Sequence, residues 1–111
     1  MTSINKIFLI GNLTNNPELR QTQSGASVAR FGLAVNQRYK GSDGEQKENV
    51  CFVNIVAWNK LAEAVASYLK KGKSVFVEGR LNQNRWDVDG QKRSKMEVVA
   101  KTIQFLSPRQ K

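Results

Sequence analysis

Most of the chain alternates between apolar and polar residues with the period of two that is typical of β-strands. Residues 4–13 are apolar on both faces of an extended chain, and the polar, Pro-containing stretch 12–17 then ends the pattern. After a Ser24-Gly25 turn, residues 27–35 again place large apolar side chains on one face. We therefore expect two strands here, the first of them central in a sheet because neither of its faces is polar.

Residues 50–58 predict a third strand, and its pattern is the most informative in the chain. Two sets of mainly apolar residues fall on its opposite faces, namely Cys51, Val53, Ile55 and Ala57 on one, and Val50, Phe52, Val56 and Trp58, with Asn54 among them, on the other. A small barrel can bury only one face of a strand. The second face needs a partner, which is a helix, another subunit or a ligand, and the pattern leaves open which face is internal.

The period changes to that of a helix at Asn59, which is a candidate N-cap. Apolar residues at Leu61, Val65 and Leu69 then lie one turn apart, and the sequence Lys-Lys-Gly at 70–72 is a typical C-terminal signal. We expect a single helix of about three turns.

Strand alternation resumes over 73–81, and the segments 84–88 and 95–103 flank Asp89-Gly90, a dipeptide that favours a tight hairpin turn. The stretch 39–49 is polar throughout and predicts a loop. The order of elements predicts an all-β fold, a five-stranded OB-fold Greek-key barrel with one α-helix between strands three and four. We expect residues 1–106 to form this single domain and residues 107–111 to form a short basic tail.

The chain is strongly basic, with a formal net charge of +9 in 111 residues. A field of this sign attracts polyanions such as nucleic acids, although it can also serve solubility alone. The single cysteine, Cys51, leaves no intramolecular disulfide to form, and no leader or apolar stretch of membrane-spanning length is visible. These features predict a cytoplasmic protein outside the membrane.

The residue types that most hydrolase mechanisms need are missing. The sequence has no histidine and one cysteine, so it offers no zinc site and no Ser-His or Cys-His nucleophile. Asp87 and Asp89 are two residues apart and offer a carboxylate-metal nuclease as an alternative, although Asp89 is also explained as a turn residue. We expect a binding protein that is not an enzyme and that uses no metal or cofactor.

Aromatic rings with neighbouring positive charges remain as the candidate chemistry. They are Tyr39 between Arg38 and Lys40, Trp86 after Arg85, and Trp58 shortly before Lys60. A ring can stack on any nucleic-acid base while adjacent cations neutralise phosphates, which gives binding with little sequence preference. Trp86 can alternatively cap one end of the barrel, and Phe52 and Trp58 can alternatively face the core.

Several blocks of the sequence, in order, resemble the bacterial-type single-stranded DNA-binding proteins. The blocks are NKIFLIGNL at 5–13, PELR at 17–20, WNKLAE at 58–63, YLKKG at 68–72, VEGRL at 77–81 and RW at 85–86. The resemblance spans nearly the whole chain. It implies an OB-fold that assembles as a homotetramer, possible also as a dimer, and that binds single-stranded DNA during replication, recombination and repair.

The resemblance also implies roles for individual residues. It aligns stacking rings with Tyr39, Phe52, Trp58 and Trp86, and phosphate contacts with Lys60, Lys71 and Arg85. Proximity to Tyr39 adds Arg38 and Lys40, while Arg20, Arg30 and Arg80 are weaker candidates. The first strand around 5–9 would pair across subunits. The family implies a nucleoid-associated cytoplasmic location, or an organellar one for a plastid source.

Two departures from the family pattern stand out. Family members often have tryptophan where this chain has Tyr39 and Phe52, so we expect stacking to persist but to be weaker. Most bacterial members also end in an acidic, phenylalanine-tipped tail that recruits enzymes, whereas the last residues here are basic. Recruitment of protein partners through such a tail is therefore not expected, and a dimeric primosomal or RNA-binding relative on the same barrel remains an alternative.

Overall fold

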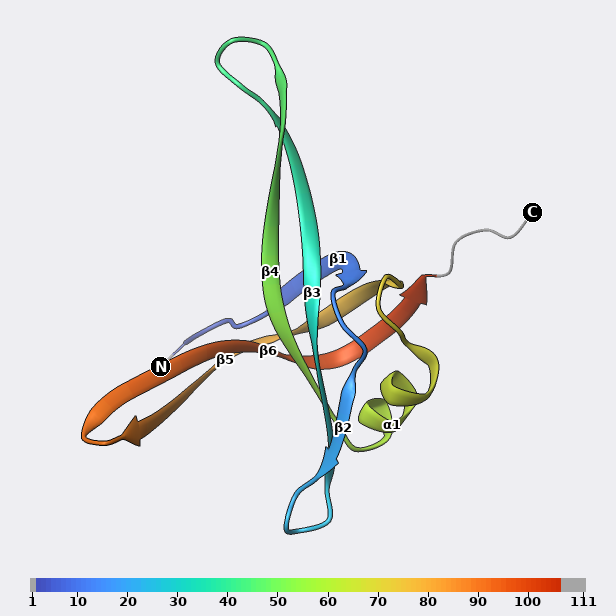
Figure 1. Cartoon of the computed structure of the whole chain (residues 1–111), viewed down its shortest axis with the longest axis vertical. Coiled ribbons are helices and arrows are strands. Elements are labelled where there is room, and N and C mark those ends of the chain that lie inside the picture. Colours follow the sequence, from blue (N-terminus) through green and yellow to red (C-terminus); the bar gives the residue numbers. More distant parts are fainter. Residues whose placement is uncertain (1, 107–111) are drawn as a thin grey trace.

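The computed structural model describes residues 2–106, and within them the chain forms six strands and one helix (Figure 1). The elements are β1 (Ile7–Leu13), β2 (Glu18–Gln21), β3 (Ser27–Lys40), β4 (Gln46–Trp58), α1 (Asn59–Tyr68), β5 (Ser74–Val88) and β6 (Gln91–Leu106). The basic tail expected at 107–111 lies outside the described residues.

The strands close into a five-stranded barrel, as the sequence predicts. Neighbours follow the order β1-β5-β6-β4-β3, and β1 also pairs with β3. The β4–β6 pair is parallel, whereas the other pairs are antiparallel. Strand β2 is the strand that the prediction of five did not include. Strand β1 pairs with β3 through Leu13 and Leu33, and β2 continues the pairing along β3, with Glu18 opposite Arg30. Strands β1 and β2 are thus one barrel strand interrupted at 14–17.

The barrel interior is filled by aliphatic side chains from every long strand. Fully buried members include Leu33, Ile55, Val75, Val77 and Val98. Helix α1 adds Ala62 and Val65 to the same core. Burying one such aliphatic side chain contributes about 1.5 to 3 kcal/mol, so this core is the main source of stability.

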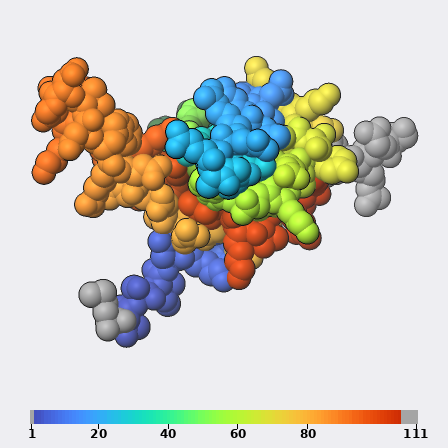
Figure 2. Space-filling model, turned by 90° about the horizontal axis from the view of Figure 1, so that it is seen from below, coloured from blue at the N-terminus to red at the C-terminus, as the bar shows by residue number. Residues whose placement is uncertain are grey.

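Two hairpins extend past the barrel as arms, one formed by the distal halves of β3 and β4 and the other by those of β5 and β6 (Figure 1). Seen from below, the β5–β6 arm, in orange, projects away from the body of the molecule (Figure 2). The radius of gyration is 16.4 Å, against about 13 Å for a compact domain of this length. The arms therefore present large surfaces that no other part of residues 2–106 covers.

The expectation of a polar loop over 39–49 was wrong. The β3–β4 ladder continues to Lys40 opposite Gln46, and only 41–45 form the turn. There Asp43 Oδ1 accepts a 3.1 Å hydrogen bond from the Glu45 amide, and Gly44 adopts a φ of 84°. An exposed two-stranded arm buries neither face, so it has no apolar alternation from which it could be predicted.

The segments 73–81 and 84–88 were expected to be separate, but they belong to the single strand β5, and β6 begins at Gln91 rather than at 95. The cause is again that an exposed two-stranded arm buries neither face. The Asp89-Gly90 turn is confirmed, because both residues have positive φ angles of 51° and 78°, and Val88 pairs with Gln91 across it. Positive φ at both central positions is the requirement of the tight hairpin turn that this dipeptide favours.

Both predicted helix signals need correction. Asn59 is the first helical residue, has a φ of 59°, and follows Trp58, which makes no side-chain capping bond. The helix ends at Tyr68 because Leu69 is already extended and is buried in the core. Gly72, with a φ of 92°, belongs to the following turn, closed by a 3.1 Å bond from the Lys73 amide to the Lys70 carbonyl.

Candidate nucleic-acid interface

Strand β4 has an internal and an external face, and the structure decides which is which. Ile55 and Ala57 are fully buried and Val53 packs against the core, whereas Phe52 is 73% exposed and Trp58 40% exposed. Successive strand residues point to opposite sides, so Phe52 and Trp58 lie on the outer face. Their alternative as core residues is thereby excluded, which leaves their rings accessible.

The other two candidate rings lie on the arms. Tyr39 is 49% exposed and pairs with Lys47 near the tip of the β3–β4 arm. Trp86 is 45% exposed and lies opposite Arg93 on the β5–β6 arm. The alternative that Trp86 caps the barrel end is therefore not the arrangement found.

The four rings do not form one cluster. Phe52 is opposite Ala34 on β3, so by strand alternation Tyr39 leaves the β3–β4 ladder on the other side from Phe52. Among the described residues, the ring pairs in contact are Phe8 with Phe76 and Tyr68 with Phe105, and neither includes a candidate. The candidate rings are instead spaced along the β4 face and both arms.

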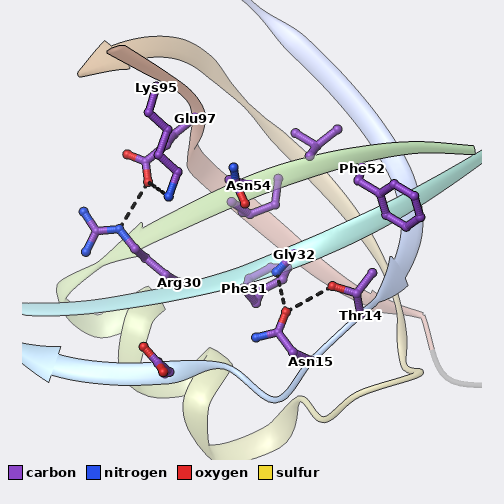
Figure 3. A pocket seen from close by; sticks show the side chains of 12 residues that line it. Thr14, Asn15, Arg30, Phe31, Gly32, Phe52, Asn54, Lys95 and Glu97 are labelled. Carbon is purple, nitrogen blue, oxygen red and sulfur yellow. Dashed lines mark hydrogen bonds and ion pairs between the residues drawn. The ribbon is translucent and has the colours of Figure 1, made fainter. Parts of the chain in front are cut away.

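A pocket of about 380 Å³ opens beside Phe52 on the outer face of β3 and β4 (Figure 3). The outer surface of these strands is where OB-folds commonly bind oligonucleotides. One wall is the segment after β1, where Asn15 Oδ1 accepts hydrogen bonds from the Gly32 amide at 2.9 Å and from Thr14 Oγ1 at 3.1 Å. A Cβ at Gly32 would collide with Thr14 Oγ1, so glycine there keeps this wall close to β3.

A buried ionic network forms the opposite part of the pocket. Glu97 is only 3% exposed, and its carboxylate accepts a 3.2 Å bond from Arg30 Nε and a 2.6 Å bond from Asn84 Nδ2. Lys95 Nζ lies 4.0 Å from the same carboxylate. Sequence reasoning missed Glu97 because a charged residue in an alternating strand is expected to face solvent.

A second groove, of about 510 Å³, surrounds Trp86 on the β5–β6 arm. Arg85 lies in it and donates a 3.0 Å hydrogen bond to Gln83. The hairpin register brings Lys92 and Arg93 into the same groove. Sequence analysis did not select these two cations. Counting residues outward from the Asp89-Gly90 turn would have predicted that Lys92 pairs with Asp87 and Arg93 with Trp86.

The remaining cations predicted for the site are exposed and spread over three regions. Arg38 forms a 3.3 Å ion pair with Glu48 across the β3–β4 arm, and Lys40 ends β3 on the same arm. Lys60 is exposed at the start of α1, two residues after Trp58. The exposed Lys71 follows α1, and its backbone amide donates a 2.9 Å bond to Asn16 Oδ1.

The weaker candidates differ in surroundings. Arg20 is highly exposed and lies 3.6 Å from Glu18, whereas Arg80 lines a separate groove with Lys6 and Lys101. Arg30 alone among the three lines the pocket beside Phe52.

Neither a metal cluster nor a membrane-spanning helix is found in residues 2–106. Within that range no three His, Cys, Asp or Glu side chains gather as metal ligands would, and no helix is long and apolar enough to cross a bilayer. Asp89, one of the two carboxylates of the nuclease alternative, occupies the hairpin turn.

Comparison with known proteins identifies the family. The family described as "Single-strand binding protein family" matches residues 4–106. The chain belongs to this single-strand binding protein family. It is 47% identical over 103 residues to a single-stranded DNA-binding protein of Wolinella succinogenes, with 92% of the chain and 64% of the relative covered. It is 43% identical over 113 residues to single-stranded DNA-binding protein 2 of Chlorobaculum tepidum, with 100% and 76% covered.

Solved structures of the family have the same barrel. A Plasmodium falciparum SSB in complex with ssDNA superposes with a TM-score of 0.88 at 28% identity, covering 96% of this chain and 98% of that one. A deletion mutant of the single-stranded DNA-binding protein from Thermus aquaticus gives a TM-score of 0.86 at 34% identity, with 96% and 52% covered. The chain thus spans less than two thirds of the Wolinella relative and about half of the Thermus chain.

Proposed function

We propose that this chain binds single-stranded DNA with little sequence preference, by stacking bases on exposed rings and neutralising phosphates with adjacent cations. The observation that carries the proposal is the outward placement of Phe52 and Trp58 on β4, with the core on the opposite face. An accessible ring in a family of single-strand binding proteins has a direct use, since every base has a face on which it can stack.

The spacing of the rings favours an extended ligand. Phe52, Trp58, Tyr39 and Trp86 lie apart on the barrel and the arms, so a single small molecule does not fit them together. A flexible single strand can pass from one ring to the next, and the stacking platforms of such proteins are distributed in this way along a positively charged path. The cations Arg38, Lys40, Lys60, Lys71 and Arg85 lie along that path in the proposal.

The proposal includes assembly into a homotetramer. In the chain itself, β1 pairs with β5 from Ile7 to Asn12, but with β3 only at Asn12 and Leu13. Within the described residues, the second edge of β1 is thus unpaired over most of its length, and Phe8 and Ile10 are exposed on its outer face. Such an edge supports pairing with a second copy, which is the role expected for 5–9.

We further propose that the protein protects single strands during replication, recombination and repair, in the cytoplasm with the nucleoid. Its relatives are named as binding proteins, which agrees with a role without catalysis. A dimeric primosomal or RNA-binding relative is the outcome to distinguish from this proposal.

The test is a titration of matched dT and rU homopolymers, combined with native mass measurement of the protein with and without a long dT strand. The proposal predicts preference for dT and a tetramer that binds the long strand. Equal or stronger binding of rU, or a dimer that does not change on binding, would favour the alternative.

A further inference from the structure

The Arg30–Glu97 pair in the pocket beside Phe52 carries an inference of its own. A buried carboxylate is costly unless it is paired and hydrogen-bonded. Glu97 is 3% exposed and meets that requirement through Arg30 from β3, Asn84 from β5 and Lys95 from its own strand. The carboxylate therefore fixes the positions of side chains from three strands beneath the groove.

Arg30 uses only part of its guanidinium in this pair. The hydrogen bond to Glu97 comes from Nε, and none of the hydrogen bonds recorded among the described residues involves its two terminal nitrogens. Figure 3 shows these nitrogens directed away from the carboxylate. The Arg30 side chain lines the pocket and is 47% exposed, so solvent reaches part of it.

The pocket beside Arg30 contains groups that suit a nucleotide, together with the carboxylate of Glu18, which lies opposite Arg30 on β2. Phe52, a candidate stacking ring, and Asn54, an exposed amide, line the same pocket. A planar guanidinium with two free nitrogens matches the geometry of a phosphate oxygen pair. The ring, the amide and the guanidinium are of the chemical types that suit a base face, a base edge and a phosphate, respectively.

We propose that Arg30 binds a phosphate of the single strand in this pocket, and that Glu97 is a positioning residue that holds the guanidinium in the orientation required. This inference rests on the proposed function, because it adds a subsite to the same interface. The charge of Glu97 can affect phosphate binding in two opposite ways, and the proposal favours the second. As a bare charge, Glu97 repels phosphate, whereas as a positioning group it improves phosphate binding through Arg30.

A double-mutant cycle on the affinity for a labelled dT oligomer separates these effects, with Arg30→Gln, Glu97→Gln and the double variant. We expect Arg30→Gln to weaken binding about five- to tenfold, which is within the range of one ordinary hydrogen bond. The slope of log affinity against log salt should fall by about 0.7, the value for one phosphate contact on a single strand. Glu97→Gln should weaken binding in the unmodified background and have no further effect once Arg30 is replaced.

Arg30→Lys provides a second test that does not depend on removing the buried carboxylate. Lysine keeps the charge but has a single ammonium, which cannot pair with Glu97 and present a planar fork to phosphate. We expect it to bind nearly as weakly as Arg30→Gln. Lys101→Gln, which removes an exposed charge in the separate groove, is the matched control, and thermal unfolding of every variant checks that the barrel is intact.

Four results would overturn the inference. Tighter binding by Glu97→Gln would mean that the carboxylate acts only by repulsion, and equal weakening in both backgrounds would assign it a structural role alone. An unchanged salt slope in Arg30→Gln, or full affinity in Arg30→Lys, would remove Arg30 as a phosphate ligand. If the unmodified chain fails to bind dT, the proposed function itself fails, so the two failures are distinguishable.

Discussion

Phe52 and Ile55 are three residues apart on β4 and point to opposite sides of the barrel wall. Ile55 is fully buried, whereas Phe52 is exposed over most of its surface. The core therefore does not need the Phe52 ring, and a ring exposed to this extent gains little from hydrophobic burial in the isolated chain. Its position is explained if a ligand covers it.

Removing either tryptophan should weaken binding without unfolding the protein. We expect Trp58→Ala and Trp86→Ala each to cost about 1 to 3 kcal/mol of binding free energy to a dT homopolymer, the range found for a base stacked on a ring. Fluorescence anisotropy with labelled oligomer measures the change. Tyr68→Ala removes an exposed ring on α1 that is not one of the four proposed stacking rings, and is the matched control. Retained affinity in both tryptophan variants would make these rings structural.

The size of the ring at Phe52 should set the strength of binding. Phe52→Leu keeps an apolar side chain but loses the π face, so binding should weaken by about 1 to 3 kcal/mol. Phe52→Trp enlarges the stacking surface and should bind more tightly than the unmodified chain. Both variants alter a side chain outside the core, so their thermal unfolding midpoints should stay close to the original. An equal affinity for leucine, phenylalanine and tryptophan would show that nothing stacks at this position.

The sequence predicts the barrel strands better than it predicts β2 and the two arms. The strands of the barrel were predictable because they bury one face, and burial leaves an alternating pattern such as that around Ile55. Strand β2 and the arms were not, since β2 is exposed along its whole length and the arm pair Arg38–Glu48 faces solvent. A strand that pairs through its backbone but buries neither face does not need alternating apolar and polar side chains, so its sequence does not show that pattern.

The candidate site shows the same division. The pattern of β4 placed Phe52 and Trp58 on one face but could not tell which face was internal, because both are apolar. That choice depends on the closure of the barrel through the β4–β6 pair of Ile55 with Val98. The burial of Glu97 was equally beyond the pattern, since it depends on Arg30 and Asn84 from strands that are distant in sequence.

Phosphate contacts can be tested through the salt dependence of binding. Replacing Lys71 or Arg85 by glutamine should each reduce the log-log salt slope by about 0.7 per lost contact. The cause is that fewer counterions are released from the strand when fewer cations neutralise it. Affinities measured over a salt series give the slope directly. A residue whose replacement leaves the slope unchanged does not contact phosphate.

The wall between Gly32 and Thr14 should be sensitive to one methyl group. Gly32→Ala places a Cβ against Thr14 Oγ1, and overpacking of this kind costs about 1 to 3 kcal/mol of unfolding free energy. Urea denaturation measures the loss. Adding Thr14→Ala removes the colliding hydroxyl and should restore part of the stability. No loss in Gly32→Ala, or no recovery in the double variant, would contradict the close approach.

The nuclease alternative predicts that the protein cleaves single strands, whereas the proposed function predicts that it does not. We expect labelled single strands to remain intact when the protein is incubated with magnesium or manganese. Cleavage that is abolished in Asp87→Asn would establish a carboxylate-metal reaction and overturn the assignment as a binding protein.

The most direct test of base stacking is the intrinsic fluorescence of the two tryptophans, Trp58 and Trp86. Two variants, Trp58→Phe and Trp86→Phe, each leave one indole as the reporter while keeping an aromatic ring at the other position. On titration with a dT homopolymer, the account predicts that the emission of each remaining indole is quenched as the strand binds. Emission that stays unchanged in both variants while labelled oligomer is bound would contradict it, because the bases would then lie elsewhere on the protein.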